Sequence, residues 1–517
     1  MDQNGHSAKR VFAGGRGRRL GVAALLILAA GWAYWPALDR VFVADQLGYF
    51  SELHGETSLA AGLRLLDYGA RRQYAKGDEA SYRPLLFAEL AVGNAVLKRD
   101  FRAWNAVNLA FHLAVAVLLF EVLRRRSSMA LAAGFALWFA LLAANFELVT
   151  WNHLGGYMLG YGLLLAALAA AREWADPAAG DGWGWFYGCA MLGAMLFHEI
   201  GVVAAFGGAA YVGWSQRRRP AARRLRGLLA AGAPIALYAA LYARHATQCS
   251  RLFWVNAEGA AGSFLTRLAA VPVLMGRWAQ HALLPRPDQL VVSALRRSTW
   301  LPVDFHSPWL WLAAALGAGT ALFLARGFTR ARCREAGPFA LLLVGLVVVY
   351  AGLNLTGRPA YALTVPYYDY FPALLGAVAF VSLIDCGRVS PGARRGALAC
   401  LLLLAALNGW QLRRIGERMQ ALNGPLARYL EWVEQGVRPR LAETGFSFAV
   451  RGAPPEFDLH GPLVFGYPDQ GLTAEMPLLH FLYGKRYNSS TPAEMLVYPG
   501  PETPRRGPER GAAPPAD

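Results

Sequence analysis

Apolar runs close to membrane-spanning length recur from residue 20 to residue 410, separated by short polar segments. A helix needs about 20 mainly apolar residues to cross a bilayer. The pattern therefore predicts an all-α polytopic membrane protein with about 11 transmembrane helices. The predicted spans are residues 20–38, 101–123, 129–146, 156–172, 183–197, 200–214, 227–243, 309–325, 338–354, 366–386 and 397–410.

Two further apolar runs fit a span less well. Residues 84–97 are too short to cross a bilayer, and a span here would move the arginines at 124–126 to the outer side. Residues 264–284 carry Arg277 and His281 within an apolar run. We predict an interfacial or re-entrant element for the first run and an amphipathic helix on the outer face for the second.

Arginine clusters give the predicted orientation. The loops that begin at residues 124, 217, 326 and 388 each hold several arginines. Lys and Arg favour the cytoplasmic side, and the predicted spans place all four loops on the same side as the basic N-terminus, residues 1–19. We therefore predict a bacterial inner-membrane protein with a cytoplasmic N-terminus. Its transmembrane domain would cover residues 20–410, with the first outer loop at 39–100.

The C-terminal part changes character after residue 410. Residues 411–435 show the spacing of an amphipathic helix, and the following segment is rich in Pro and Gly with short apolar runs. We predict a small periplasmic module over residues 411–498, with some strand. Residues 499–517 are dominated by Pro, Gly and Arg, a composition typical of a disordered tail.

Composition agrees with a membrane protein. Hydrophobic residues make up 55% of the 517-residue chain and charged residues 16%, against about 25% charged residues in soluble domains. The net charge of +17 would suggest nucleic-acid binding in a soluble protein. Here the arginine-rich loops account for it, and we predict no nucleic-acid partner. The five cysteines show no paired spacing, so neither a disulfide framework nor a zinc site is predicted.

Polar residues that could carry chemistry gather in the predicted outer loops. A charged group is costly inside a bilayer, so polar residues at its edge mark function or contacts between helices. They come from segments that are distant in the sequence, and the first follows the first span directly. The candidates are Asp45, Tyr82, Arg83, Glu147, His153, His198, Glu199 and Arg358.

These residue types suit the transfer of a sugar from a lipid phosphate. Arginines such as Arg83 and Arg358 can bind a phosphate through two parallel hydrogen bonds. A carboxylate such as Asp45 can accept the proton of an acceptor hydroxyl as general base. Asp45 and Glu147 could instead bind a divalent metal, Mg²⁺ or Mn²⁺, that neutralises the leaving phosphate. The sequence leaves both roles of Asp45 open.

Several short motifs occur in an order that resembles a known superfamily. Asp45 is followed by Tyr82-Arg83-Pro84-Leu85, Asn108-Leu109-Ala110-Phe111-His112, Glu147-Leu148-Val149-Thr150-Trp151, Phe197-His198-Glu199-Ile200 and Arg277-Trp278-Ala279-Gln280-His281-Ala282-Leu283-Leu284-Pro285. Over residues 30–410 this order resembles the GT-C glycosyltransferases, which are polytopic enzymes that use lipid-phosphate sugars. The relatives in view are the protein O-mannosyltransferases, the aminoarabinose transferases and, most closely, the transmembrane and tetratricopeptide-repeat mannosyltransferase-like proteins.

The chain departs from these relatives at three points. Gln46 follows Asp45 where many relatives carry a second acid, which weakens the case for a metal. His198 stands in place of the usual lysine before Glu199. No tetratricopeptide array follows the membrane part, so a protein acceptor is less favoured.

The candidates also have structural interpretations. Asp45 could cap a helix, Arg83 could extend to lipid headgroups, and His198 with Glu199 could form a salt-bridged turn. Asn108 and His112 lie four residues apart on one helix face, which favours a contact with a neighbouring helix.

The resemblance implies a GT-C-like bundle and an inverting transfer of a sugar from a polyprenyl-phosphate donor to a periplasmic glycolipid, polysaccharide or protein. Asp45 would be the base or a metal ligand, and Arg83 and Arg358 would hold the phosphate. The implied partners are the donor, membrane lipid and an unidentified acceptor. Two other classes stay open: a transporter or flippase for a lipid-linked intermediate, and a catalytically silent scaffold of a cell-envelope assembly. Transporters usually show repeated halves, and none is visible in this sequence.

Overall fold

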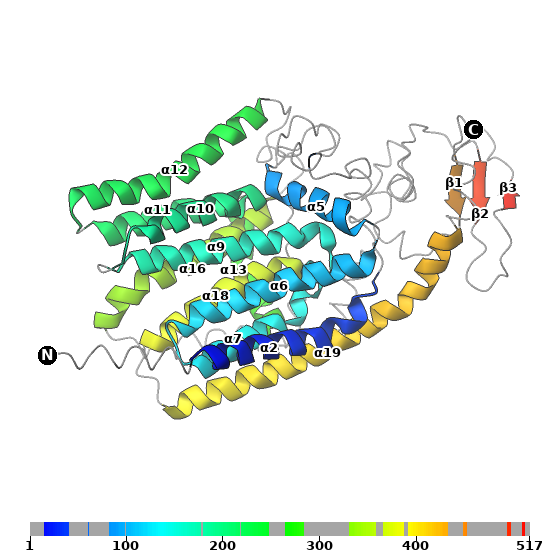
Figure 1. The fold of residues 1–517 in the computed structure, drawn as a ribbon, viewed down its shortest axis with the longest axis horizontal. Coiled ribbons are helices and arrows are strands. Elements are labelled where there is room, and N and C mark those ends of the chain that lie inside the picture. Colours follow the sequence, from blue (N-terminus) through cyan, green and yellow to red (C-terminus); the bar gives the residue numbers. More distant parts are fainter. Residues whose placement is uncertain are drawn as a thin grey trace.

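The fold is a bundle of long helices that pack side by side (Figure 1). The computed structural model describes the backbone of residues 15–40, 60, 82–98, 100–176, 179–217, 219–247, 264–283, 330–357, 366–386, 391–432, 448–451, 494–497 and 509–511.

Six helices in this part of the chain are long and apolar enough to cross a membrane. They are α2 (Gly15–Tyr34), α6 (Phe101–Arg124), α9 (Gly155–Trp174), α12 (Ala221–Ala246), α16 (Arg330–Gly357) and α19 (Pro391–Trp432). A seventh span is possible if the bent pair formed by α7 (Met129–Ala140) and α8 (Phe146–Thr150) counts as one. By length and composition, the protein is therefore a multi-pass membrane protein.

The predicted count of about 11 spans is not confirmed. Predicted spans 183–197, 200–214 and 366–386 are helical, but α10 (Gly182–Phe197), α11 (Ile200–Gln216) and α18 (Tyr370–Cys386) have only 16, 17 and 17 residues. The predicted span at 309–325 lies outside the described residues. The 14-residue α5 (Pro84–Leu97) matches the predicted short element at 84–97.

Local signals explain where several helices begin. The Asp100 carboxylate accepts a hydrogen bond of 2.9 Å from the Ala103 N–H, and so caps α6. The Ser128 hydroxyl accepts a bond of 3.3 Å from the Leu131 N–H at the start of α7. Pro84 occupies the first turn of α5, where a missing N–H is harmless.

The predicted helix 129–146 is broken, contrary to expectation. The chain bends by 46° between α7 and the segment formed by η3 (Ala143–Asn145) and α8. Side chains satisfy the backbone groups that the break releases. The Asn408 carbonyl accepts from the Ala143 N–H at 3.0 Å, the Asn145 amide donates to the Phe139 carbonyl at 3.0 Å, and His112 Nε2 donates to the Ala140 carbonyl at 3.0 Å. Backbone groups at membrane depth need such partners because no water is available there.

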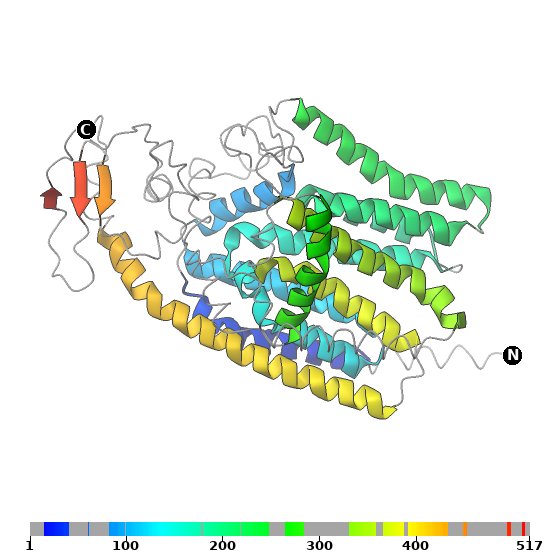
Figure 2. The ribbon, with the colours of Figure 1, turned by 180° about the vertical axis from the view of Figure 1, so that it is seen from behind.

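Helix α13 (Phe264–Leu283) runs across the other helices in the rear view (Figure 2). It contacts α16, α18, η3 and η6 (Pro366–Asp369), and the Trp138 indole donates to the Ala282 carbonyl at 3.0 Å. The segment is helical as predicted. Its Arg277 and His281 side chains are buried against the bundle.

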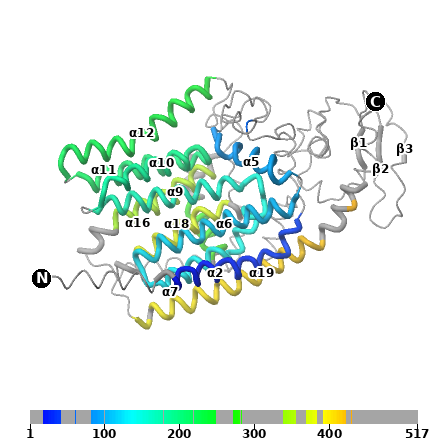
Figure 3. The backbone as a smooth tube through the Cα atoms, in the orientation of Figure 1, coloured from blue at the N-terminus to red at the C-terminus, as the bar shows by residue number. Residues whose placement is uncertain are grey.

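The last long helix, α19, continues through the predicted boundary at residue 411 without a break. It packs along α2 and η1 (Trp35–Ala37), as the trace in Figure 3 also shows for α2. At 1.5 Å per residue its 42 residues extend for about 63 Å. The helix therefore continues well past the predicted span at 397–410.

Three short strands follow: β1 (Phe448–Arg451), β2 (Glu494–Val497) and β3 (Glu509–Gly511). β1 pairs with β2 in parallel, Phe448 opposite Glu494, and β3 pairs antiparallel to β2. The strands agree with the expectation of some strand after the membrane part. The last one falls inside the tail that we predicted to be disordered, so residues 509–511 of that tail have a pairing partner.

Candidate functional site

A buried ion pair joins two of the predicted site residues. Arg83 immediately precedes α5, and Glu199 lies in the turn between α10 and α11. Arg83 Nε lies 2.7 Å from one carboxylate oxygen of Glu199 and 2.8 Å from the other. The side chains are only 16% and 12% exposed. The pair therefore connects segments that are 116 residues apart in the sequence.

Three aromatic side chains, Tyr157, Tyr161 and His198, complete this cluster. Arg83 Nη1 donates to the hydroxyl of Tyr157, near the start of α9. The Tyr157 ring meets His198 edge-on with 4.5 Å between ring centroids, and Tyr161 lies 5.5 Å from the same imidazole. The Ile200 N–H donates to His198 Nδ1 at 3.1 Å, so the neutral ring carries its proton on Nε2.

The cluster lies at one end of the bundle. We call the end that holds Arg83, Tyr157, His198 and Glu199 the polar end. The opposite end holds the arginines at 124–126, and we call it the arginine-rich end. Helix α9 runs from one to the other, because Tyr157 lies in its first turn and Glu173 in its last turn bonds to Arg126 at 3.0 Å.

Burial and charge set the ionisation of the cluster. Burial lowers the pKa of His198 to about 4, and although Glu199 opposes this effect, Arg83 adds to it. Burial alone would raise the pKa of Glu199, but the Arg83 charge, His198 and the hydrogen bond from Arg83 outweigh it and hold that pKa below its usual value. At neutral pH the cluster is therefore an ionised pair beside a neutral imidazole.

Tyr82 anchors the segment that carries Arg83. Its ring stacks on His245 with centroids 5.3 Å apart, and Tyr238 and Tyr242 meet it edge-on at 5.8 and 6.4 Å. The Tyr238 hydroxyl donates to the Tyr82 carbonyl at 3.5 Å. The side chain is buried and contacts α12, and its proposed role in substrate binding stays a prediction.

Glu147 and His153 lie in short helices, not in the open outer loop that the sequence suggested. Both side chains are buried, and the Trp151 ring lies 5.2 Å from the imidazole of His153. The neighbouring Thr150 hydroxyl accepts a hydrogen bond of 2.7 Å from Arg40. This bond ties the beginning of the predicted loop 39–100 to the segment that holds Glu147.

Two predicted residues, Asp45 and Arg358, lie outside the described residues. Their roles stay predictions. The metal site also stays a prediction, because Asp45 is one of its two proposed ligands. Among the described residues no three His, Cys, Asp or Glu side chains come together as a metal site would require.

A second buried pair was not predicted. His281 Nδ1 in α13 lies 2.5 Å from Asp369 Oδ2 in η6, and both side chains are almost fully buried. Burial raises the pKa of Asp369, and His281 and then Arg277 act against this rise. The sequence placed His281 on an outer amphipathic helix but gave no signal for Asp369, whose partner is 88 residues away.

Two polar side chains, Asn108 and Glu89, approach Gly155 where α5, α6 and α9 meet. A Cβ atom on Gly155 would lie 2.5 Å from Asn108 Oδ1 and 3.4 Å from Glu89 Oε1. Burial raises the pKa of Glu89 to about 8. His112 confirms the expected contact between helices, because Nδ1 accepts from Tyr370 and Nε2 donates to the Ala140 carbonyl. Asn108 makes no hydrogen bond to the described residues through its side chain.

Comparisons with known proteins give a limited result. No family model matches the sequence, and no curated protein matches it. Two solved structures of ArnT from Cupriavidus metallidurans have a similar arrangement. The one bound to undecaprenyl phosphate has a TM-score of 0.49, 12% identity and 93% coverage of each chain. The apo structure has a TM-score of 0.48, 13% identity and 94% coverage of each chain. Neither likeness assigns a family.

Proposed function

We propose that the protein is a membrane glycosyltransferase that takes a sugar from a polyprenyl-phosphate donor. The observation that carries the proposal is the Arg83–Glu199 pair at the polar end. Both residues belong to motifs of the GT-C resemblance, which are far apart in the sequence, and the fold brings them together. A buried ion pair at the edge of an apolar bundle is costly unless it is well bonded, so its presence there favours a functional role.

The proposed reaction is a single displacement. The oxygen of an acceptor hydroxyl forms a bond to the anomeric carbon of the sugar while the bond from that carbon to the donor phosphate breaks. The hydroxyl proton passes to the carboxylate of Asp45, and polyprenyl phosphate leaves with the bonding electron pair. The anomeric centre is inverted.

Arg83 is the proposed ligand of the donor phosphate. Its guanidinium is held by Glu199 through Nε and by Tyr157 through Nη1, so its plane is fixed at the polar end. A planar, oriented guanidinium matches the geometry of a phosphate better than a flexible ammonium group does. Glu199 and Tyr157 are positioning residues in this scheme, and Arg358 is a second proposed phosphate ligand.

A divalent metal is not needed for this proposal. Glu147, the described member of the predicted metal pair, is buried in α8. A metal held by Asp45 and Glu147 would neutralise charge on the leaving phosphate, and it remains a separate hypothesis.

The test compares surface glycolipids and glycoproteins by mass spectrometry in cells with and without the gene. Deletion should remove one sugar modification, and the wild-type gene should restore it. Asp45→Asn should not restore it, and Arg83→Lys should restore it at a level reduced by at least tenfold. Arg102→Gln is the matched control, because Arg102 forms an exposed ion pair with Asp39, 3.2 Å away, near the start of the first predicted loop.

Other outcomes would select a different function. Unchanged glycans after deletion would favour the scaffold. Full restoration by Asp45→Asn would remove Asp45 from the mechanism. Movement of a lipid-linked sugar across the membrane that survives loss of Asp45 and Glu147 would favour a transporter or flippase.

A further inference from the structure

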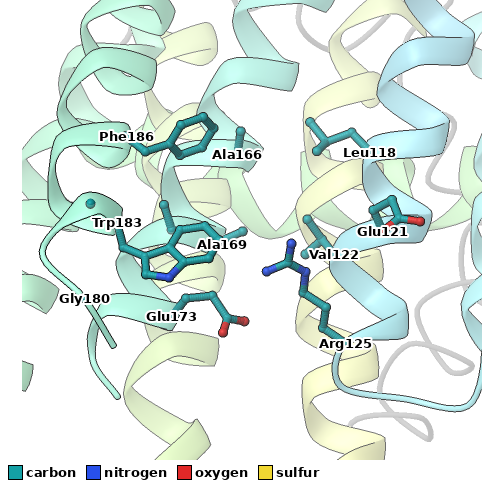
Figure 4. Close-up of a pocket in the computed structure, with 12 residues that line it drawn as sticks. Leu118, Glu121, Val122, Arg125, Ala166, Ala169, Glu173, Gly180, Trp183 and Phe186 are labelled. Carbon is teal, nitrogen blue, oxygen red and sulfur yellow. The ribbon is translucent and has the colours of Figure 1, made fainter. Parts of the chain in front are cut away.

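A groove opens between α6, α9 and α10 at the arginine-rich end (Figure 4). Its volume is about 600 Å³, within the range of sites that hold small molecules, about 300–1,000 Å³. Its walls are mainly apolar, with Leu118 and Val122 from α6, Ala166 and Ala169 from α9, and Phe186 from α10. Along α9, Ala166 and Ala169 lie about 14 and 18 Å from Tyr157, at 1.5 Å per residue. The groove is thus separate from the candidate functional site.

Charged residues line the groove near the ends of α6 and α9. Glu121 is bonded to Arg124, and Glu173 lies 3.0 Å from Arg126, so these charges are paired. Arg125 makes no salt bridge to the described residues. Its guanidinium lies over the ring of Trp183, 5.5 Å from the centroid, and both side chains line the groove.

The charge balance at this end is positive. Arg19 and Arg125 act electrostatically on Glu121 in addition to its ion-pair partner Arg124, and Glu173 is paired with Arg126, so the cations outnumber these two carboxylates. An anion bound at Arg125 would therefore meet a net positive field. Arginine and tryptophan are also the side chains that membrane proteins place at the level of lipid headgroups.

We propose that the groove binds an anionic phospholipid of the adjoining leaflet. Its phosphodiester would lie at Arg125 beside Trp183, and one acyl chain would follow the apolar wall formed by Leu118, Val122 and Phe186. Basic pockets between transmembrane helices bind anionic headgroups in this way. The alanines of α9 leave a channel for an acyl chain, and the surplus positive charge selects an anionic headgroup over a zwitterionic one. The proposal does not depend on the proposed enzymatic function.

The test measures lipid retained by the purified full-length protein, using native mass spectrometry in detergent micelles. The probes are dioleoyl-phosphatidylglycerol and dioleoyl-phosphatidylcholine. The wild-type protein should retain the anionic lipid about fivefold better, as expected for about 1 kcal/mol from one basic residue at a membrane surface. Arg125→Gln should reduce this preference to less than twofold.

The matched control is Arg217→Gln. Arg217 is exposed and lies over Trp214, 4.3 Å from the ring centroid, but neither residue lines the groove. This variant should keep the wild-type preference. It also tests whether any arginine paired with a tryptophan at this end would give the same selectivity.

A second variant tests the apolar part of the groove. Ala166→Phe would fill the channel beside Leu118 and should lower retention of both lipids at least threefold. Each variant should elute as wild type in size-exclusion chromatography. Equal preference in Arg125→Gln and wild type, or unchanged retention in Ala166→Phe, would overturn the proposal. A polyprenyl monophosphate that displaces phosphatidylglycerol at equal concentration would show that the assigned occupant is wrong.

Discussion

Arg83 and Glu199 neutralise each other's charge at the polar end. Removing one member of a buried pair leaves an uncompensated charge, which destabilises a protein by about 3–5 kcal/mol. We expect Glu199→Gln to lower the melting temperature of the detergent-purified protein clearly. Asp39→Asn, which breaks the exposed pair with Arg102, should cost less than about 1 kcal/mol.

A double mutant measures the interaction energy between Arg83 and Glu199 separately from the other effects of each substitution. If Arg83 and Glu199 stabilise each other, Arg83→Gln combined with Glu199→Gln should cost less than the sum of the single variants. Simple additivity would mean that the two side chains act independently, contrary to the geometry.

His198 should make stability depend on pH. The unfolded chain binds a proton at this residue near pH 6.5, whereas the folded protein binds it only near pH 4. Between these values the unfolded state holds more protons, so the free energy of unfolding falls as the pH is lowered. The loss is on the order of 3 kcal/mol over the full interval.

Melting temperatures measured between pH 7.5 and 4.5 test this expectation. Glu89, with its pKa raised to about 8, acts in the opposite direction over this range, so the test is the difference between two proteins. His198→Gln cannot take up the proton at this position, so wild type should lose stability relative to this variant as the pH falls. Glu199 has a lowered pKa, so its own contribution is lost only below its usual value of 4.5. An equal slope in both proteins above pH 4.5 would assign the pH dependence to other groups.

The turn between α10 and α11 depends on one glycine. A Cβ atom on Gly201 would lie 2.6 Å from the Met195 nitrogen and 2.7 Å from the Ala194 carbonyl carbon. These are backbone atoms and cannot move aside as a side-chain tip can. We therefore expect Gly201→Ala to displace α11 and to disturb Glu199. The variant should be destabilised by about 1–3 kcal/mol.

Gly213→Ala is the matched control in the same helix. A Cβ atom there meets nothing within 4 Å in the described part of the chain. Alanine is favoured over glycine in a helix by about 1 kcal/mol, so this variant should be neutral or more stable. The melting temperature should therefore fall for Gly201→Ala and stay equal or rise for Gly213→Ala, and a similar loss in both would contradict the steric argument.

Helices with regular apolar patterns were predictable, and the broken ones were not. The predicted 101–123 and 156–172 correspond to α6 and α9, because both are long apolar runs and Asp100 also caps the first. The break after Ala140 depends on Asn408, which is 265 residues from the backbone group that it satisfies. No local sequence signal marks this break. In α19 the polar residues from Gln411 onward suggested a boundary, but the helix continues through them to Trp432.

The candidate site shows the same limit. Motif order identified Arg83, His198 and Glu199, and the fold places them together. Tyr157 was not among the candidates, because only its position beside Arg83 in the fold gives it a role. Pairing across the molecule is set by tertiary packing, which the local pattern of a sequence does not contain.

At the scale of the whole molecule, the two ends of the bundle differ in charge. The polar end holds a neutralised pair, whereas the arginine-rich end keeps surplus cations such as Arg125 and Arg217. Lys and Arg favour the cytoplasmic side of a membrane. The predicted topology therefore places the polar end, with Arg102 near the start of α6, in the periplasm.

Labelling of single cysteines tests this orientation. In a background without the five native cysteines, Arg102→Cys and Arg217→Cys place one thiol at each end of the bundle, at positions that are exposed in the structure. A membrane-impermeant maleimide should label Arg102→Cys in intact spheroplasts and Arg217→Cys only after lysis. The opposite pattern would place the polar end in the cytoplasm. A periplasmic acceptor could not reach it there, and the phospholipid proposed for the groove would belong to the outer leaflet of the membrane.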